Sequence, residues 1–88
     1  MIMKNINIYT TPYCPFCRRA KELLKNKKVK FNEIDLSQTP DKFEEMVKKS
    51  NGAKTVPQIF VEDKHIGDCD FVHSLDANGK LDKILGIK

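Results

Sequence analysis

With 88 residues, 40% of them hydrophobic and 32% charged, the sequence has the composition of one small folded domain over residues 1–88 and not of a disordered chain. No apolar run approaches the roughly 20 residues of a membrane-spanning helix, and residues 1–10 lack the apolar core of an export signal. The net charge of +4 arises from scattered residues, 16 basic and 12 acidic, which favours small anionic substrates over nucleic acid.

The first part of the chain predicts a strand, a helix and a second strand. Polar and apolar residues alternate over Lys4–Tyr9, as in a half-buried strand, and again over residues 29–36. A helix is predicted over Pro15–Asn26, because proline favours the first turn and the lysines at the end suit the helix dipole. The apolar residues on one face of this helix are Phe16, Ala20, Leu23 and Leu24, and those of the second strand are Val29, Phe31 and Ile34 or Leu36.

A second helix is predicted within residues 39–52. We expect Thr39 to cap it, Pro40 to occupy its first position and Gly52 to end it, with acidic residues early and lysines late. Its buried stripe is predicted to consist of Phe43, Met46 and Val47.

The last part predicts a hairpin and one or two short helices. Residues 58–61 and 65–67 form short strands around a tight turn at Glu62–Lys64, which is too short for a crossover, so the pair is antiparallel. Residues 70–88 are helical, with a break at Asn78–Gly79 and packing by Leu75, Leu81, Ile84 and Leu85. The order strand–helix–strand–helix–strand–strand–helix predicts an α/β fold with a four-stranded mixed sheet and helices on both faces.

The stretch "YTTPYCPFCRRAKELL" places Cys14 at the start of the first helix and Cys17 one turn inside it. Residues three apart on a helix lie about 5–6 Å apart, which is within the Cα range of a disulfide, so the pair can close and reopen without backbone movement. The helix N-terminus, with Arg18, Arg19 and Lys21, favours a thiolate at Cys14. We therefore predict that Cys14 attacks and Cys17 resolves.

A Cys-x-x-Cys pair can also bind a metal. Structural zinc usually takes four ligands in two close pairs, and only Cys69 with His65 or His73 could complete such a set here. A [2Fe–2S] cluster shared between chains and external thiols stays an alternative. We read both histidines as ordinary polar residues and Cys69 as a packing thiol in preference to a third redox centre. Three cysteines do not make a disulfide framework, so we expect a reducing, cytoplasmic location.

The stretches "YTTPYCPFCRRAKELL", "KTVPQIFVEDKHIGD" and "GDCD", in this order and spacing, resemble a glutaredoxin of the small dithiol bacterial type over nearly the whole chain. The resemblance implies a thioredoxin-like fold, with glutathione as co-substrate and neither a metal nor a bound cofactor. Cys14 would accept a glutathione moiety, and Cys17 would resolve intermediates with protein dithiols. The implied partners are glutathione, disulfide-containing or glutathionylated proteins and, through glutathione, glutathione reductase. From the scattered charges, the lack of a long apolar run and the chain length, we expect no nucleic-acid or membrane partner and a monomer.

The resemblance also implies where glutathione binds. Pro57 would match the family's cis-proline, which lets the Val56 backbone pair with the glutathione backbone like an added strand. The backbone N–H groups of Cys69 and Asp70 would hold the γ-glutamyl carboxylate, and the Asp70 carboxylate would hold the ammonium group or cap the next helix. Lys54 would meet the glycine carboxylate. The implied site consists of Cys14, Phe16, Lys54, Thr55, Val56, Pro57, Cys69 and Asp70.

Three positions depart from the family pattern. Thr11 stands where lysine is usual, Phe16 where many members have tyrosine, and Asp68 where glycine is usual. Asp68 adds a negative charge beside an anionic ligand, so we expect weaker glutathione binding. Two other functions stay open. One is a redoxin that is reduced by a flavoprotein reductase, which Thr11 and Asp68 favour. The other is a module that shuttles or senses iron–sulfur clusters, and Pro15 counts against it.

Overall fold

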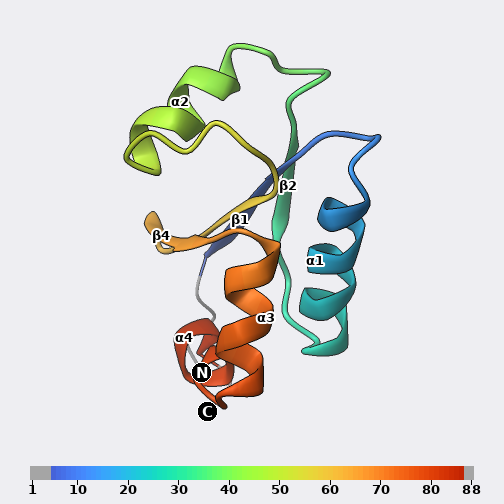
Figure 1. Ribbon diagram of the computed structural model, residues 1–88, viewed down its shortest axis with the longest axis vertical. Coiled ribbons are helices and arrows are strands. Elements are labelled where there is room, and N and C mark those ends of the chain that lie inside the picture. Colours follow the sequence, from blue (N-terminus) through green and yellow to red (C-terminus); the bar gives the residue numbers. More distant parts are fainter. Residues whose placement is uncertain (1–4, 87–88) are drawn as a thin grey trace.

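The computed structural model describes residues 5–86, which form a four-stranded sheet with four helices (Figure 1). None of the helices in this part of the chain combines the length and apolar character needed to cross a membrane. In chain order the elements are β1 (Ile6–Thr10), α1 (Pro15–Asn26), β2 (Asn32–Asp35), α2 (Lys42–Lys49), β3 (Gln58–Val61), β4 (Lys64–Gly67), α3 (Cys69–Ala77) and α4 (Leu81–Leu85).

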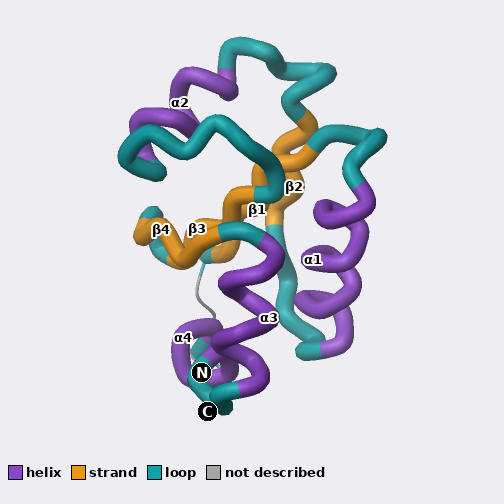
Figure 2. Tube along the Cα trace, viewed as in Figure 1, coloured by secondary structure: helices purple, strands orange, loops and turns teal. Residues whose placement is uncertain are grey.

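The sheet has the strand order β2-β1-β3-β4 and is mixed, as predicted (Figure 2). The strands β1 and β2 are parallel and are connected through α1, whereas β3 runs antiparallel to both β1 and β4. The hairpin turn consists of Glu62 and Asp63, whose φ angles of 52° and 64° suit the twist of a two-residue hairpin. This arrangement places the loop before β3 and the end of β4 close to the start of α1.

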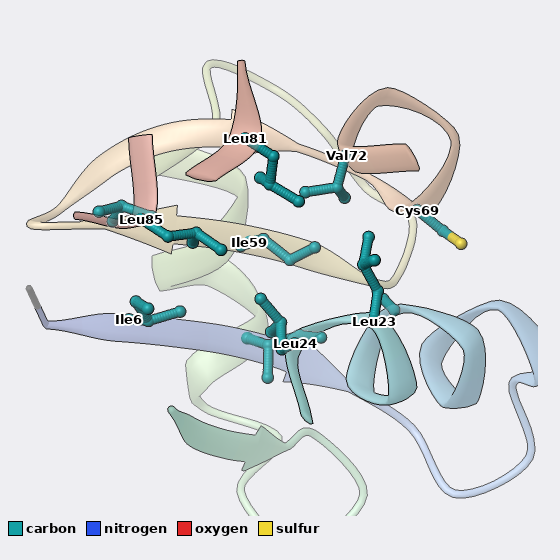
Figure 3. Close-up of a cluster of buried hydrophobic side chains, with 11 residues drawn as sticks. Ile6, Leu23, Leu24, Ile59, Cys69, Val72, Leu81 and Leu85 are labelled. Atoms are coloured by element: carbon teal, nitrogen blue, oxygen red, sulfur yellow. The ribbon is translucent and has the colours of Figure 1, made fainter. Parts of the chain in front are cut away.

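Helices cover both faces of the sheet, which confirms the predicted layers. The helices α1, α3 and α4 pack on one face and α2 on the other (Figure 1). On the first face, Leu24 of α1 and Leu81 of α4 are fully buried in one cluster with Ile8 and Ile59 of the two central strands. Figure 3 shows Leu24, Leu81 and Ile59 in this cluster. The second, smaller cluster consists of Tyr9, Leu36, Met46 and Phe60, with Ile34, Val47 and Val56 partly buried beside it.

The second helix begins later than predicted. It starts at Lys42, after Asp41, so Pro40 lies outside it and Thr39 does not cap it. The Thr39 hydroxyl instead donates to the Asp35 carbonyl at 2.8 Å, closing the turn that ends β2. The predicted buried stripe is also partly wrong, because Phe43 is 40% exposed while Met46 is buried.

The strands are shorter or shifted relative to the prediction. The first strand runs from Ile6 to Thr10, and Lys4 lies outside the described residues. The second strand is limited to Asn32–Asp35. Val29 and Phe31 lie before it and pack against the hydrophobic cluster on the α1 side of the sheet. The prediction for α1 and β3 is confirmed at both ends, and β4 begins one residue early, at Lys64. The last segment contains two helices, separated at Asn78 and Gly79.

Candidate active site

The two cysteines of the pair occupy different environments at the start of α1. Cys14 is the N-cap residue and is partly exposed, and its Sγ accepts a hydrogen bond from the backbone N–H of Cys17 at 3.3 Å. The Cys17 side chain is 1% exposed, and both thiols are free. The predicted contrast between an accessible and a buried sulfur is therefore confirmed.

Cys17 is held as a neutral thiol. Burial, together with the neighbouring Cys14 sulfur, raises the pKa of Cys17 to about 12, and the Thr11 backbone and the charge of Lys21 only partly oppose this. Since the thiolate is the nucleophile in disulfide exchange, Cys17 is unreactive toward external disulfides near neutral pH. It can act once a disulfide on Cys14 places a sulfur directly beside it.

This difference predicts selective alkylation. In a Cys14→Ser variant the burial that raises the pKa of Cys17 remains while the contribution of the Cys14 sulfur is lost, so at pH 8 we expect iodoacetamide to leave Cys17 largely unmodified and its labelling rate to rise with pH. In a Cys17→Ser variant, Cys14 should be labelled rapidly at pH 8. Peptide mass spectrometry distinguishes the three cysteines. Equal labelling rates for Cys14 and Cys17 at pH 8 would contradict this account of the pair.

A groove lies next to Cys14. The Cys14 thiol is within hydrogen-bonding distance of the Val56 carbonyl, at 3.7 Å, and the Val56–Pro57 bond is cis, as the resemblance implied. The groove has a volume of about 280 Å³. It is lined by Phe16, Thr55, Val56, Pro57, Asp68, Cys69 and Asp70. Six of the eight residues implied for the glutathione site are thus brought together, and Cys14 adjoins them through Val56.

Two expectations for this region need correction. Phe16 was predicted to share a face with Ala20, but it is 49% exposed, because the buried stripe of α1 begins at Cys17 and the Phe16 ring lines the groove instead. Lys54 is exposed and is not among the residues that line the groove.

The start of α3 forms the other wall of the groove. Its N-cap is Asp68, whose Oδ1 accepts a hydrogen bond from the Phe71 backbone N–H at 3.0 Å. The alternative in which Asp70 caps this helix is therefore wrong, and the exposed Asp70 carboxylate stays available for other interactions. Cys69 is 2% exposed and packs in the core near Leu23, which agrees with a packing thiol (Figure 3). Burial also raises the pKa of Cys69.

Cys14 also lines a second hollow, of about 450 Å³. Lys21 reaches this hollow, and its Nζ pairs with Glu33 of β2 at 2.9 Å. Within residues 5–86, no group of three or more His, Cys, Asp and Glu side chains is clustered as metal ligands would be. The second hollow consists of Thr11, Pro12, Tyr13, Cys14, Pro15, Cys17, Arg18 and Lys21.

Sequence reasoning missed one interaction near the groove. His65, read as an ordinary polar residue, lies 2.6 Å from the side chain of Gln58, which in turn bonds to Thr55. The structure pairs Phe60 with His65, which puts Gln58 and His65 on the same face of the sheet. The predicted turn at Glu62–Lys64 would instead pair Val61 with His65 and place Gln58 on the opposite face, so the interaction could not be inferred from the predicted hairpin.

Comparison with known proteins agrees with this geometry. The family model for glutaredoxin matches residues 6–66. Glutaredoxin 3 of Escherichia coli is 51% identical over 83 residues, which cover 94% of this chain and 99% of that protein. The solution structure of glutaredoxin from Brucella melitensis has a TM-score of 0.82 at 47% identity, covering 97% of this chain and 91% of that one. A buckwheat glutaredoxin–glutathione complex has a TM-score of 0.84 at 28% identity, with coverages of 93% and 76%. The thioredoxin-like α/β fold is thereby confirmed.

Proposed function

The chain belongs to the glutaredoxin family, whose members are thiol–disulfide oxidoreductases, and from that premise we propose that it uses glutathione to reduce protein disulfides and glutathione mixed disulfides. The observation that carries the proposal is the N-cap position of Cys14 beside a groove that ends at Asp68, Cys69 and Asp70. The similarity to a glutaredoxin solved in complex with glutathione supports the choice of ligand. The proposal places the protein in the cytoplasm as a monomer, with residues 1–88 as a single domain.

The reaction with a glutathione mixed disulfide needs Cys14 alone. The Cys14 thiolate attacks the glutathione sulfur, an S–S bond forms between Cys14 and glutathione, and the client leaves as a thiolate that takes up a proton. The thiolate of a second glutathione then attacks the glutathione sulfur of this intermediate. Oxidised glutathione leaves, the Cys14 thiolate is restored, and glutathione reductase regenerates glutathione.

Protein disulfides are proposed to require Cys17 as well. Attack by Cys14 gives a mixed disulfide with the client protein, and Cys17 then loses its proton and attacks the Cys14 sulfur. The client leaves as a thiol and a Cys14–Cys17 disulfide forms, which two glutathione molecules reduce. The burial of Cys17 supports this division, because a neutral thiol does not compete for the incoming disulfide.

Glutathione is proposed to lie along the groove with its backbone against Val56. The backbone N–H groups of Cys69 and Asp70, in the first turn of α3, would bind the γ-glutamyl carboxylate. The Asp70 carboxylate would bind the ammonium group, a role supported by its freedom from helix capping. Phe16 and Thr55 would contact the tripeptide from either side, and Lys54 would move toward the glycine carboxylate from its exposed position.

The Asp68 carboxylate has two effects on this site: it caps α3, and it adds negative charge beside the proposed carboxylate ligand. Two substitutions separate these effects. Asp68→Asn keeps a capping oxygen and removes the charge, so we expect the KM for a glutathionylated peptide to fall about threefold with little change in stability. Asp68→Ala should lower KM similarly and cost about 1 kcal/mol of unfolding free energy. An unchanged KM in both variants would show that Asp68 does not face the ligand.

The proposed function is tested by glutathione-dependent reduction of a glutathionylated peptide, coupled to glutathione reductase and NADPH. Turnover that depends on both glutathione and the protein is the expected result. Inactivity with glutathione, combined with electron transfer from thioredoxin reductase, would instead support a redoxin served by a flavoprotein. Inactivity in both assays, with visible absorbance after anaerobic purification, would favour the iron–sulfur alternative.

A further inference from the structure

The side chain of Gln58 is hydrogen-bonded at both ends of its amide and connects β4 to the groove. Gln58 is the first residue of β3 and is 3% exposed. Its Nε2 donates to the Thr55 carbonyl at 3.0 Å and to the Thr55 hydroxyl at 3.3 Å, and its Oε1 lies 2.6 Å from Nε2 of His65. We refer to Thr55, Gln58 and His65 with these bonds as the Gln58 bridge.

The direction of each bond in the Gln58 bridge follows from donor and acceptor chemistry. The Thr55 carbonyl can only accept, so the NH₂ end of the Gln58 amide must face Thr55. The oxygen end then faces His65, which must donate through Nε2–H. Both the neutral Nε2–H tautomer and the imidazolium carry this proton. The ring of Phe60 packs against the imidazole, with centroids 5.1 Å apart, and holds it in place.

The Gln58 bridge acts on the segment that forms the groove wall. Thr55 is exposed and precedes β3, so the sheet does not hold it. Within residues 5–86, the hydrogen bonds that reach Thr55 come from Gln58. Thr55 and Val56 both line the groove, and the Val56 carbonyl lies 3.7 Å from the Cys14 sulfur. Fixing Thr55 therefore fixes the part of the wall that adjoins the reactive thiol.

We propose that Gln58 and His65 are positioning residues for the reaction at Cys14. His65 orients the Gln58 amide, and the amide holds Thr55 so that the groove stays formed for the glutathione moiety of the substrate. This inference rests on the proposed function, because it takes glutathione as the ligand of the groove. Neither side chain touches the reacting sulfurs, so loss of the bridge lowers the fraction of molecules with a formed groove. The expected effect is on KM and not on kcat.

His65 is the best position for the test because its side chain is exposed and its replacement spares the core. In the coupled assay with a glutathionylated peptide, we expect His65→Leu to raise KM about fivefold to tenfold and to change kcat less than about twofold. His65→Gln keeps an N–H donor at the same reach and should return KM to within about twofold of wild type.

A second pair of variants tests the other end of the bridge. Gln58→Glu keeps an acceptor for His65 and loses both donors to Thr55, so KM should rise about tenfold or more. Gln38→Glu makes the same charge change in the exposed turn after β2 and should leave KM unchanged. Melting temperatures of all variants identify any general loss of structure.

The outcomes separate the inference from the proposed function. Equal KM values for wild type and His65→Leu overturn the inference, as does an equal rise in His65→Leu and His65→Gln, since the donor would then be irrelevant. A wild type without glutathione turnover overturns the proposed function instead. In that case the ¹⁵N–¹H resonance of Val56 tests the bridge directly. The chemical shift of this resonance should change in His65→Leu and keep its wild-type value in His65→Gln. An unchanged chemical shift in both variants overturns the proposed role of the Gln58 bridge.

Discussion

Replacing Cys14 with serine is expected to abolish glutathione-dependent activity, by about three orders of magnitude or more. A serine hydroxyl stays protonated at neutral pH and cannot form the mixed disulfide through which both proposed reactions pass. The substitution is nearly isosteric, and the serine oxygen can still accept the Cys17 backbone N–H that the Cys14 sulfur now accepts. The fold should therefore survive, and the loss can be assigned to chemistry.

The matched control is Cys17→Ser, measured with two substrates. We expect it to turn over a glutathionylated peptide at a rate within a few-fold of wild type, because that reaction uses Cys14 alone. Reduction of an intramolecular protein disulfide should fall by about 10²-fold, since the client cannot be released by Cys17. If Cys17→Ser were dead with both substrates and Cys14→Ser active with one, the roles of the two cysteines would be reversed.

Replacing Gly67 with alanine is expected to cost about 3 kcal/mol of unfolding free energy, which lowers the melting temperature by roughly 12–24 °C for a domain of this size. Gly67 ends β4 with a φ of 144°, a conformation that residues with a side chain rarely adopt. An added Cβ would also lie 2.6 Å from Cδ2 and 2.8 Å from Cβ of Phe71. Strain in the backbone and overlap with α3 therefore act together. Thermal unfolding followed by circular dichroism measures the loss.

Two further variants separate these causes. Gly79 has a φ of 73°, and nothing lies within 4 Å of a Cβ added there, so Gly79→Ala should cost only about 1 kcal/mol of unfolding free energy. Adding Phe71→Ala to Gly67→Ala removes the ring but leaves the Phe71 Cβ at 2.8 Å, so the cost should fall only in part. Equal costs at Gly67 and Gly79 would show that the contact with Phe71 relaxes freely.

The sequence predicted most of the fold where several local signals agreed. The bounds of α1 followed from a proline in the first turn, apolar residues at helical spacing and a basic end. The start of α2 did not, because Thr39 can serve either as a helix cap or as the end of a turn. Its hydroxyl bonds to Asp35, a choice that depends on the path of the chain after β2. The local sequence propensities of these residues do not predict that path.

The site was predictable in part for the same reason. The spacing of Cys14 and Cys17 at a helix start is local and indicated which sulfur is exposed. The wall formed by residues 55–57 and 68–70 depends on the antiparallel pairing of β3 with β4, and only the family resemblance placed it next to Cys14. The capping role of Asp68 and the exposure of Phe16 required the packing of α1 and α3, which the sequence pattern does not specify.

Trapping the glutathione intermediate tests the central claim most directly. A Cys17→Ser variant, incubated with oxidised glutathione and freed of excess reagent, is digested and its peptides are analysed by mass spectrometry. We predict one glutathione moiety per chain, attached to Cys14, with Cys69 unmodified because it is buried. Glutathione attached to Cys69, or no stable adduct at Cys14, would contradict the proposed mechanism.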